Sequence, residues 1–350
     1  MEKSKNANKL TGQFGILCTL TKRHLKMFFK NKMTFFFSLM VPLVTILIYF
    51  LFLRGLEKTS VISFLQNPGP DIDVDFSSLL NSTSFINELT YLIDKWMLSG
   101  VIAVSCITVS FNTCYIMIAD QENGVNRDFV SSPISKNIIV LSYFLYNFIV
   151  TFLINLIVLI LVLFYIVWTG TFFFSFSDIL LIVVIIIYSV ISSTLVTIFL
   201  ASFRKIAKNF NSVIALVSSG IGFLIGAFMP GNMVPSGVNY FMALIPGTYS
   251  TSLLRSSFLD SSISHLMDKA AILDISIDDY NRIYSYLTGQ FSMNVNLFGL
   301  EITYKYMYLV LFIFIVIFLI LNLSFARINL DRGLAGPRHH PKHKAKQKTE

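Results

Sequence analysis

The sequence predicts an all-α membrane protein with six transmembrane helices, an N-terminal interfacial amphipathic helix and a re-entrant outer hairpin after the fifth helix. Apolar residues make up 55% of the 350 positions and charged residues only 13%, a balance typical of membrane proteins. A bilayer core takes about 20 consecutive apolar residues to cross. Six uncharged, His-free segments approach or exceed that length: Phe35–Leu53, Trp96–Ile118, Ile138–Trp168, Ile179–Phe203, Val213–Met229 and Tyr306–Phe325.

The distribution of charge predicts how these helices are oriented. With both termini in the cytoplasm, the inner segments hold 20 of the 27 Lys and Arg residues and the outer segments hold 7. Cytoplasmic loops of membrane proteins carry such a positive excess, and an even helix count places both termini on one side. Because the basic segments flank apolar spans, we expect a multi-pass cell-membrane protein and no nucleic-acid partner.

Three parts of the chain follow from this topology. Residues 1–34 form a cytoplasmic N-terminus, residues 35–326 a transmembrane domain with outer loops 54–95 and 230–305, and residues 327–350 a basic cytoplasmic tail. Within the first part, residues 9–32 combine an apolar stripe with lysines, which suits the surface of an anionic inner leaflet and makes membrane lipid an expected partner. A soluble helix packed on a partner protein is the alternative. The apolar stripe consists of Leu10, Phe14, Leu17, Leu25 and Phe28.

No metal or cofactor site is expected. Asp71, Asp73 and Asp75 alternate with apolar residues, but the Gly and distal Glu of a calcium-binding EF-hand loop are missing, which favours a solvated acidic edge. The histidines at 339, 340 and 343 lie in the basic tail, where a disordered segment is the simpler interpretation. No phosphate-binding loop or zinc-protease motif occurs either, so the chain itself is not expected to be an enzyme.

The cytoplasmic segment 119–137 mixes charged and apolar residues. Such a mixture suits docking onto another protein, and an ordinary connecting loop is the alternative. The expected docking residues are Glu122, Gly124, Arg127, Phe129 and Pro133.

The uncharged stretch 209–254 cannot be one simple span. Gly222 and Gly226 form a G-x-x-x-G step that lets helices approach closely, either in a dimer or within one subunit. Prolines and glycines then break the pattern, which predicts a re-entrant hairpin over 230–244, with an apolar outer loop as the alternative. We expect an outer gate here, formed by Phe228, Met229, Met233 and Phe241.

These motifs resemble the membrane subunit of type-2 ABC exporters, the permeases that export drugs, polysaccharides and antibiotics. Glu122, Gly124 and the run Ser132-Pro133-Ile134 are similar to the family's coupling segment, although Val125 and Asn126 depart from its usual residues. The stretch 228–235 resembles the re-entrant region, and Pro246 to Tyr249 resembles the family's Pro-x-x-Tyr element. The resemblance covers about residues 10–326.

The resemblance implies a permease subunit of an ATP-driven exporter that moves an amphiphilic substrate such as a drug, antimicrobial peptide, lipid or polysaccharide. It also implies two partners: a second permease subunit, identical or related, and a separate cytoplasmic ATP-binding-cassette ATPase. A stand-alone secondary transporter or channel is the alternative. The uncharged spans disfavour it, because ion-coupled transporters bury ionisable groups at membrane depth.

Overall fold

The computed structural model describes residues 2–66, 77–132, 134–172, 174–229, 234–270, 277–297 and 300–334. The first half of the chain contains α1 (Glu2–Lys30), α2 (Lys32–Ile48), the π-helix η1 (Tyr49–Leu53), α3 (Arg54–Gln66), α4 (Ser77–Leu80), α5 (Thr83–Thr113), α6 (Tyr115–Glu122) and α7 (Val125–Ser131). The second half contains α8 (Lys136–Trp168), α9 (Phe176–Ala201), α10 (Arg204–Lys208), α11 (Phe210–Leu224), α12 (Ser236–Met242), α13 (Pro246–Ala270), α14 (Ile277–Gln290), β1 (Val295–Leu297), β2 (Leu300–Ile302) and α15 (Tyr304–Leu334). The two strands form an antiparallel hairpin.

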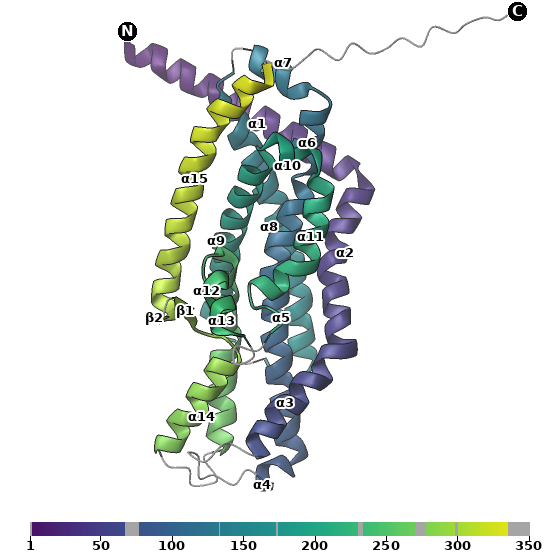
Figure 1. Ribbon diagram of the computed structural model, residues 1–350, viewed down its shortest axis with the longest axis vertical. Helices are drawn as coiled ribbons and strands as arrows, with labels where there is room; N and C mark the ends of the chain where they lie inside the picture. The colour runs from purple at the N-terminus through teal and green to yellow at the C-terminus, as the bar shows by residue number, and fades with distance from the viewer. Residues whose placement is uncertain are drawn as a thin grey trace, which may run out of the picture.

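The long helices run side by side and give the molecule two distinct ends. At one end lie α6, α7 and α10, and α1 crosses the bundle there (Figure 1). We call this the elbow end, and both the N-terminus and the end of α15 lie at it. At the opposite end, which we call the cap end, lie α3, α4 and α14.

Five helical stretches in the described residues are long and apolar enough to cross a membrane: Lys32–Gln66, Thr83–Glu122, Lys136–Trp168, Phe176–Ala201 and Tyr304–Phe325. They contain four of the six predicted segments and all but the last two residues of another, Ile179–Phe203, so the helical membrane class is confirmed. The fifth predicted segment, Val213–Met229, does not form a full span. It falls in α11, which has 15 residues and ends at Leu224 because the chain turns sharply at Gly226.

Helix α5 is the centre of the bundle. Of the 18 most apolar consecutive residues in the stretch that contains α5, 89% are buried. The corresponding share is 17% for the stretch that contains α2 and 11% for α15. Helix α5 packs against α2, α8, α9, α11 and α13. The other long helices therefore surround α5 and direct much of their apolar surface outward, as expected where lipid or a second membrane subunit replaces water.

The two predicted outer loops are largely helical in the described residues. Helix α2 continues without a break through η1 into α3, and α5 begins at Thr83, well before the predicted span. Apolar residues of α3, α5, α13 and α14 form a second core at the cap end, including Leu65, Leu89, Ile263 and Leu287. Apolar residues of α13 and α14 thus pack together with those of the first predicted outer segment.

Candidate functional site

A sharp turn separates α6 from α7 at the elbow end. Gly124 has a φ of 78°, a left-handed conformation that costs glycine little and other residues more. The amide of Asn123 closes α6 on the carbonyl oxygen of Ala119 at 2.9 Å. We call α6, the turn and α7 the elbow, and it contains four of the five residues that the sequence analysis assigned to partner docking: Glu122, Gly124, Arg127 and Phe129.

The docking residues do not share one environment. Glu122 is exposed, whereas Phe129 is partly buried against the main core. Arg127 lies in α7, and Pro133 lies outside the described residues. The amide of Gln121 donates to the carbonyl oxygen of Ala201 at 3.2 Å, which ties the elbow to the end of α9. The elbow therefore presents a charged group outward and anchors apolar and amide groups inward.

Asp120 of α6 joins the elbow to two other helices. Arg23 of α1 donates to both of its carboxylate oxygens, at 2.8 and 2.9 Å. The hydroxyl of Tyr143 in α8 donates to one of the same oxygens at 2.7 Å. Paired donors of this kind make strong, directional bonds, and the bond to Asp120 raises the pKa of Arg23. We call Asp120, Arg23 and Tyr143 the elbow clasp.

Two further contacts extend the elbow clasp. The Arg23 guanidinium lies 5.4 Å from the centre of the Phe129 ring, so one side chain contacts both helices of the elbow. His24, which is fully buried, stacks on Tyr143 with 4.3 Å between ring centres. Burial lowers the pKa of His24 to about 4, which makes the ring neutral at physiological pH. Four helices, α1, α6, α7 and α8, are thereby joined at one point.

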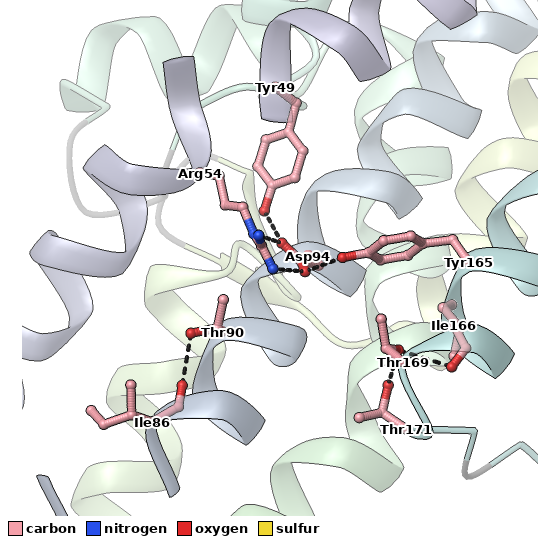
Figure 2. Close-up of polar contacts among 9 residues, drawn as sticks. All are labelled: Tyr49, Arg54, Ile86, Thr90, Asp94, Tyr165, Ile166, Thr169 and Thr171. Carbon is pink, nitrogen blue, oxygen red and sulfur yellow. Dashed lines mark hydrogen bonds and ion pairs between the residues drawn. The ribbon is translucent and has the colours of Figure 1, made fainter. Parts of the chain in front are cut away.

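A second clasp lies at the cap end, around Asp94 of α5 (Figure 2). Arg54 donates to its two carboxylate oxygens at 2.8 Å each. The hydroxyl of Tyr49 donates at 2.7 Å and that of Tyr165 in α8 at 2.6 Å. Asp94 is 1% exposed, and these four bonds satisfy both of its oxygens. We call Asp94, Arg54, Tyr49 and Tyr165 the cap clasp.

The π-helix between α2 and α3 explains how Tyr49 and Arg54 reach the same carboxylate. Residues five apart on an α-helix point about 140° away from each other. The wider turn of η1 removes most of that angle, and the amide of Arg54 bonds to the carbonyl oxygen of Tyr49. The phenol and the guanidinium therefore converge on Asp94 (Figure 2).

The bundle buries charged residues although the predicted spans contain none. The six predicted segments are uncharged, but the helices that contain them extend further and bury Asp94, Lys95 and Asp120, each at most 2% exposed. The amine of Lys95 donates to the carbonyl oxygen of Thr171 and to the hydroxyl of Ser262, at 2.7 Å each. All three groups are held by protein donors or acceptors.

Between the two clasps the contacts among α5, α8 and α9 are polar but uncharged. Asn147 donates to the carbonyl oxygen of Ser110 at 2.9 Å and accepts from Thr151 at 3.0 Å. The hydroxyls of Ser110 and Thr197 lie 3.1 Å apart. Small polar residues of this kind hold helices together where apolar surface gives little driving force. These hydrogen bonds therefore hold α5, α8 and α9 against one another.

The expected dimer glycines are explained by contacts within this chain. A side chain at Gly222 would clash with the Phe228 ring. Gly226 has a φ of 69° and ends α11, and a side chain there would meet the Met242 methyl at 2.6 Å. Packing of a second subunit against these glycines stays a prediction.

The expected gate residues surround the same turn. Phe228 and Met229 are half-buried, Phe241 is 54% exposed on α12, and Met233 lies outside the described residues. The prediction of a re-entrant hairpin is neither confirmed nor contradicted, because residues 230–233 are not described. Among the described residues no three His, Cys, Asp or Glu side chains gather as a metal site.

Sequence reasoning found the elbow but missed both clasps. Asp120 and Asp94 stand at the ends of apolar runs, where charged residues are ordinarily solvated, and their partners are distant in the chain. A family model described as ABC-2 type transporter matches residues 16–259, which include both clasps, the elbow and the turn after α11. The chain belongs to this family. An ABC-2 membrane domain is the permease part of a transporter, and a search of curated proteins returns no match.

Proposed function

We propose that this ABC-2 permease is one membrane half of an ATP-driven exporter and that its elbow end faces the cytoplasm. The described parts of the basic segments 1–34, 119–137, 204–212 and 326–350 lie at that end, and in the sequence these four segments hold 20 of the 27 Lys and Arg residues. In this orientation α1 lies along the inner membrane surface and contacts lipid. The transmembrane domain then comprises residues 35–326, and both termini are cytoplasmic.

The elbow clasp is the observation that carries the proposal. A cytoplasmic ATP-binding-cassette ATPase that docks on exposed Glu122 would also move Phe129, which packs inward beside Arg23. Arg23 holds Asp120, and Asp120 holds Tyr143 of α8. A force applied at the elbow therefore reaches α1, α6 and α8 through short bonds rather than through a flexible loop.

The mechanism is a rocking change between two states. When two ATPase subunits bind ATP and close, they bring the elbows of two permease subunits together. The helices around each elbow tilt as units, and the cavity between the subunits opens outward with an amphiphilic substrate. The ATPase drives this change only if it contacts the two states differently. The segment from Phe228 to Phe241 serves as the outer gate.

The test is co-purification and substrate-stimulated ATP hydrolysis with the partner ATPase. Phe129→Ala and Glu122→Ala should each lower the substrate stimulation about tenfold while the permease still inserts in the membrane. Phe176→Ala is the matched control, because this ring is 80% exposed on α9 away from the elbow. Normal stimulation in both elbow variants would refute docking at the elbow, and a permease that purifies and transports alone would favour the secondary transporter.

A further inference from the structure

Arg255 of α13 is an arginine buried inside the bundle. It is 1% exposed, and the described part of the chain holds no carboxylate within ion-pair distance of it. Its guanidinium lies 4.8 Å from the centre of the Trp96 ring. A charge removed from water is costly unless other groups stabilise it, so the contacts of this side chain identify its role.

Two backbone oxygens stabilise the charge. One terminal nitrogen, Nη2, donates to the carbonyl oxygen of Gly226 at 2.8 Å and to that of Ala227 at 3.0 Å. Both oxygens lie just beyond the last residue of α11. The C-terminal end of a helix carries a partial negative charge, and a cation is favourable there.

The end of α11 is a tightly closed turn. The amide of Ala227 bonds to the carbonyl oxygen of Gly222 at 2.7 Å, and that of Gly226 bonds to Phe223 at 3.1 Å. With the left-handed Gly226, this is a Schellman motif. The turn uses its amides internally and leaves the carbonyl oxygens of Gly226 and Ala227 directed at Arg255.

This turn lies within the bundle rather than beyond it. A side chain at Gly100 of α5 would come within 2.8 Å of the Ala227 oxygen. Gly100 is six residues from Asp94, or about 9 Å along the helix toward the elbow end. Beyond the end of α11, the carbonyl oxygens of Gly226 and Ala227 still need protein donors, because neither lipid nor apolar side chains supply them. Arg255 supplies them.

We propose that Arg255 is the positioning residue of the turn between α11 and α12, and thus fixes where the gate segment begins. The part of the proposal that concerns gating rests on the proposed function. The far end of α12 is held separately, because Thr248 and Tyr249 donate to the carbonyl oxygens of Met242 and Ala243. Arg255 therefore holds the start of the segment between α11 and α12, at Gly226 and Ala227.

The experiment compares the reactivity of two buried cysteines in the purified permease without the ATPase. Val234→Cys reports on the chain just after the turn, and Val190→Cys in α9 reports on the bundle elsewhere; these valines are 9% and 0% exposed. Cys18→Ser removes the exposed native thiol. Each reporter is combined with Arg255→Met or with Arg282→Met, a matched change at an exposed arginine of α14.

Arg255→Met should raise the rate of reaction with N-ethylmaleimide about threefold or more at V234C and leave the rate at V190C unchanged. Equal increases at both reporters would mean a general loss of stability and would overturn the proposal. Unchanged rates at both would overturn it as well. Arg282→Met should change neither rate.

Arg255→Lys decides the question if Arg255→Met fails to accumulate. Lysine keeps the charge, but its shorter side chain cannot stack on Trp96 and reach both oxygens. We expect the same selective increase at V234C, and rates equal to those of Arg282→Met would overturn the proposal. These rates need no nucleotide, so a failure of the gate alone, tested below with ATP, leaves the positioning result intact.

Discussion

Arg23 and Asp120 lie 97 positions apart in the chain, and their side chains meet in a two-point ion pair at 2.8 and 2.9 Å. The carboxylate is 2% exposed and the guanidinium 33% exposed, so the pair lies at the edge of the bundle with its negative member inside. The buried Asp120 carboxylate therefore depends on Arg23 to compensate its charge. Without Arg23, Asp120 would keep only the bond from Tyr143 and a weak approach to His24 at 3.7 Å.

Arg23→Met should therefore destabilise the permease strongly, by about 3–5 kcal/mol, because it leaves a buried carboxylate without its cation. The double variant Arg23→Met with Asp120→Asn should be more stable than Arg23→Met alone, since the amide carries no charge. Thermal unfolding of the detergent-solubilised variants measures both effects. Additive losses in the double variant would show that the two side chains do not depend on each other.

The cap clasp predicts a local effect. Arg54→Met should loosen the attachment of α3 to α5, because Asp94 would lose both guanidinium bonds. Hydrogen exchange in α3 should become about tenfold faster or more, while exchange in α6 stays as in wild type. Arg282→Met is the control. Equal acceleration at both ends would argue that Arg54 supports the whole bundle.

The buried His24 predicts a dependence on pH. Its pKa is about 4 in the folded protein, against 6.5 for an ordinary histidine, so acid favours the unfolded chain. The stabilisation by neutral His24 is complete above pH 6.5 and is lost as the pH falls toward 4.

The loss should reach roughly 1 kcal/mol near pH 5.5. His24→Phe, which keeps the ring stacked on Tyr143, should remove this part of the pH dependence. Unfolding temperatures of both proteins from pH 8 to pH 5 provide the measurement. Parallel curves for the two proteins would show that His24 does not contribute.

Gly226, in the turn that ends α11, allows packing within the chain to be distinguished from packing against a second subunit. Gly226→Leu requires a left-handed leucine and a clash with Met242, so it should destabilise each subunit. If α11 also packs against a second subunit, a cysteine at the exposed Leu216 should form a disulfide between subunits in the wild-type background and lose it in the variant. A disulfide that persists in Gly226→Leu would restrict the glycine to packing within its own chain.

The gate predicts reactivity that changes with nucleotide. Val238 is 44% exposed on α12, and in the Cys18→Ser background Val238→Cys should react with an external thiol reagent. The rate should change at least about threefold when ATP binds the partner ATPase, because the two states expose the segment differently. Leu300→Cys, at a position 73% exposed on β2, is the control. Equal rates with and without nucleotide would make α12 a static part of the outer surface.

Apolar runs predicted the third and fourth spans almost to the residue. The predicted Ile138–Trp168 and Ile179–Phe203 correspond to Lys136–Trp168 and Phe176–Ala201, because long uncharged helices end where polar residues begin. The same rule failed at Asp94. A charged pair at the end of an apolar run ordinarily marks a loop, but here α5 continues because Arg54 and Tyr165 compensate the charge from other helices.

The turn after α11 shows a second limit. Gly226 was evident in the sequence, and a G-x-x-x-G step gives it a role in helix packing without any break. The left-handed turn brings Phe228 over Gly222 and leaves carbonyl oxygens that Arg255 binds, and both partners are distant from what a local pattern can indicate. Arg255 itself stood inside the predicted outer loop 230–305, where nothing local indicates burial.

The two clasps also set a fixed distance between two charged positions along α5 and α6. Asp94 and Asp120 are 26 residues apart, a rise of about 39 Å along a helix, against a hydrocarbon thickness of about 30 Å in an ordinary bilayer. Each carboxylate is fastened to an arginine that is about one-third exposed and needs water or lipid headgroups. Moving either charged level into the hydrocarbon would cost the free energy of burying a charge, so we expect the subunit to resist shortening in a thin membrane. A bilayer of unsuitable thickness must deform around the subunit or tilt it. Lipid chain length should therefore change the strain in the transporter without any change in its sequence.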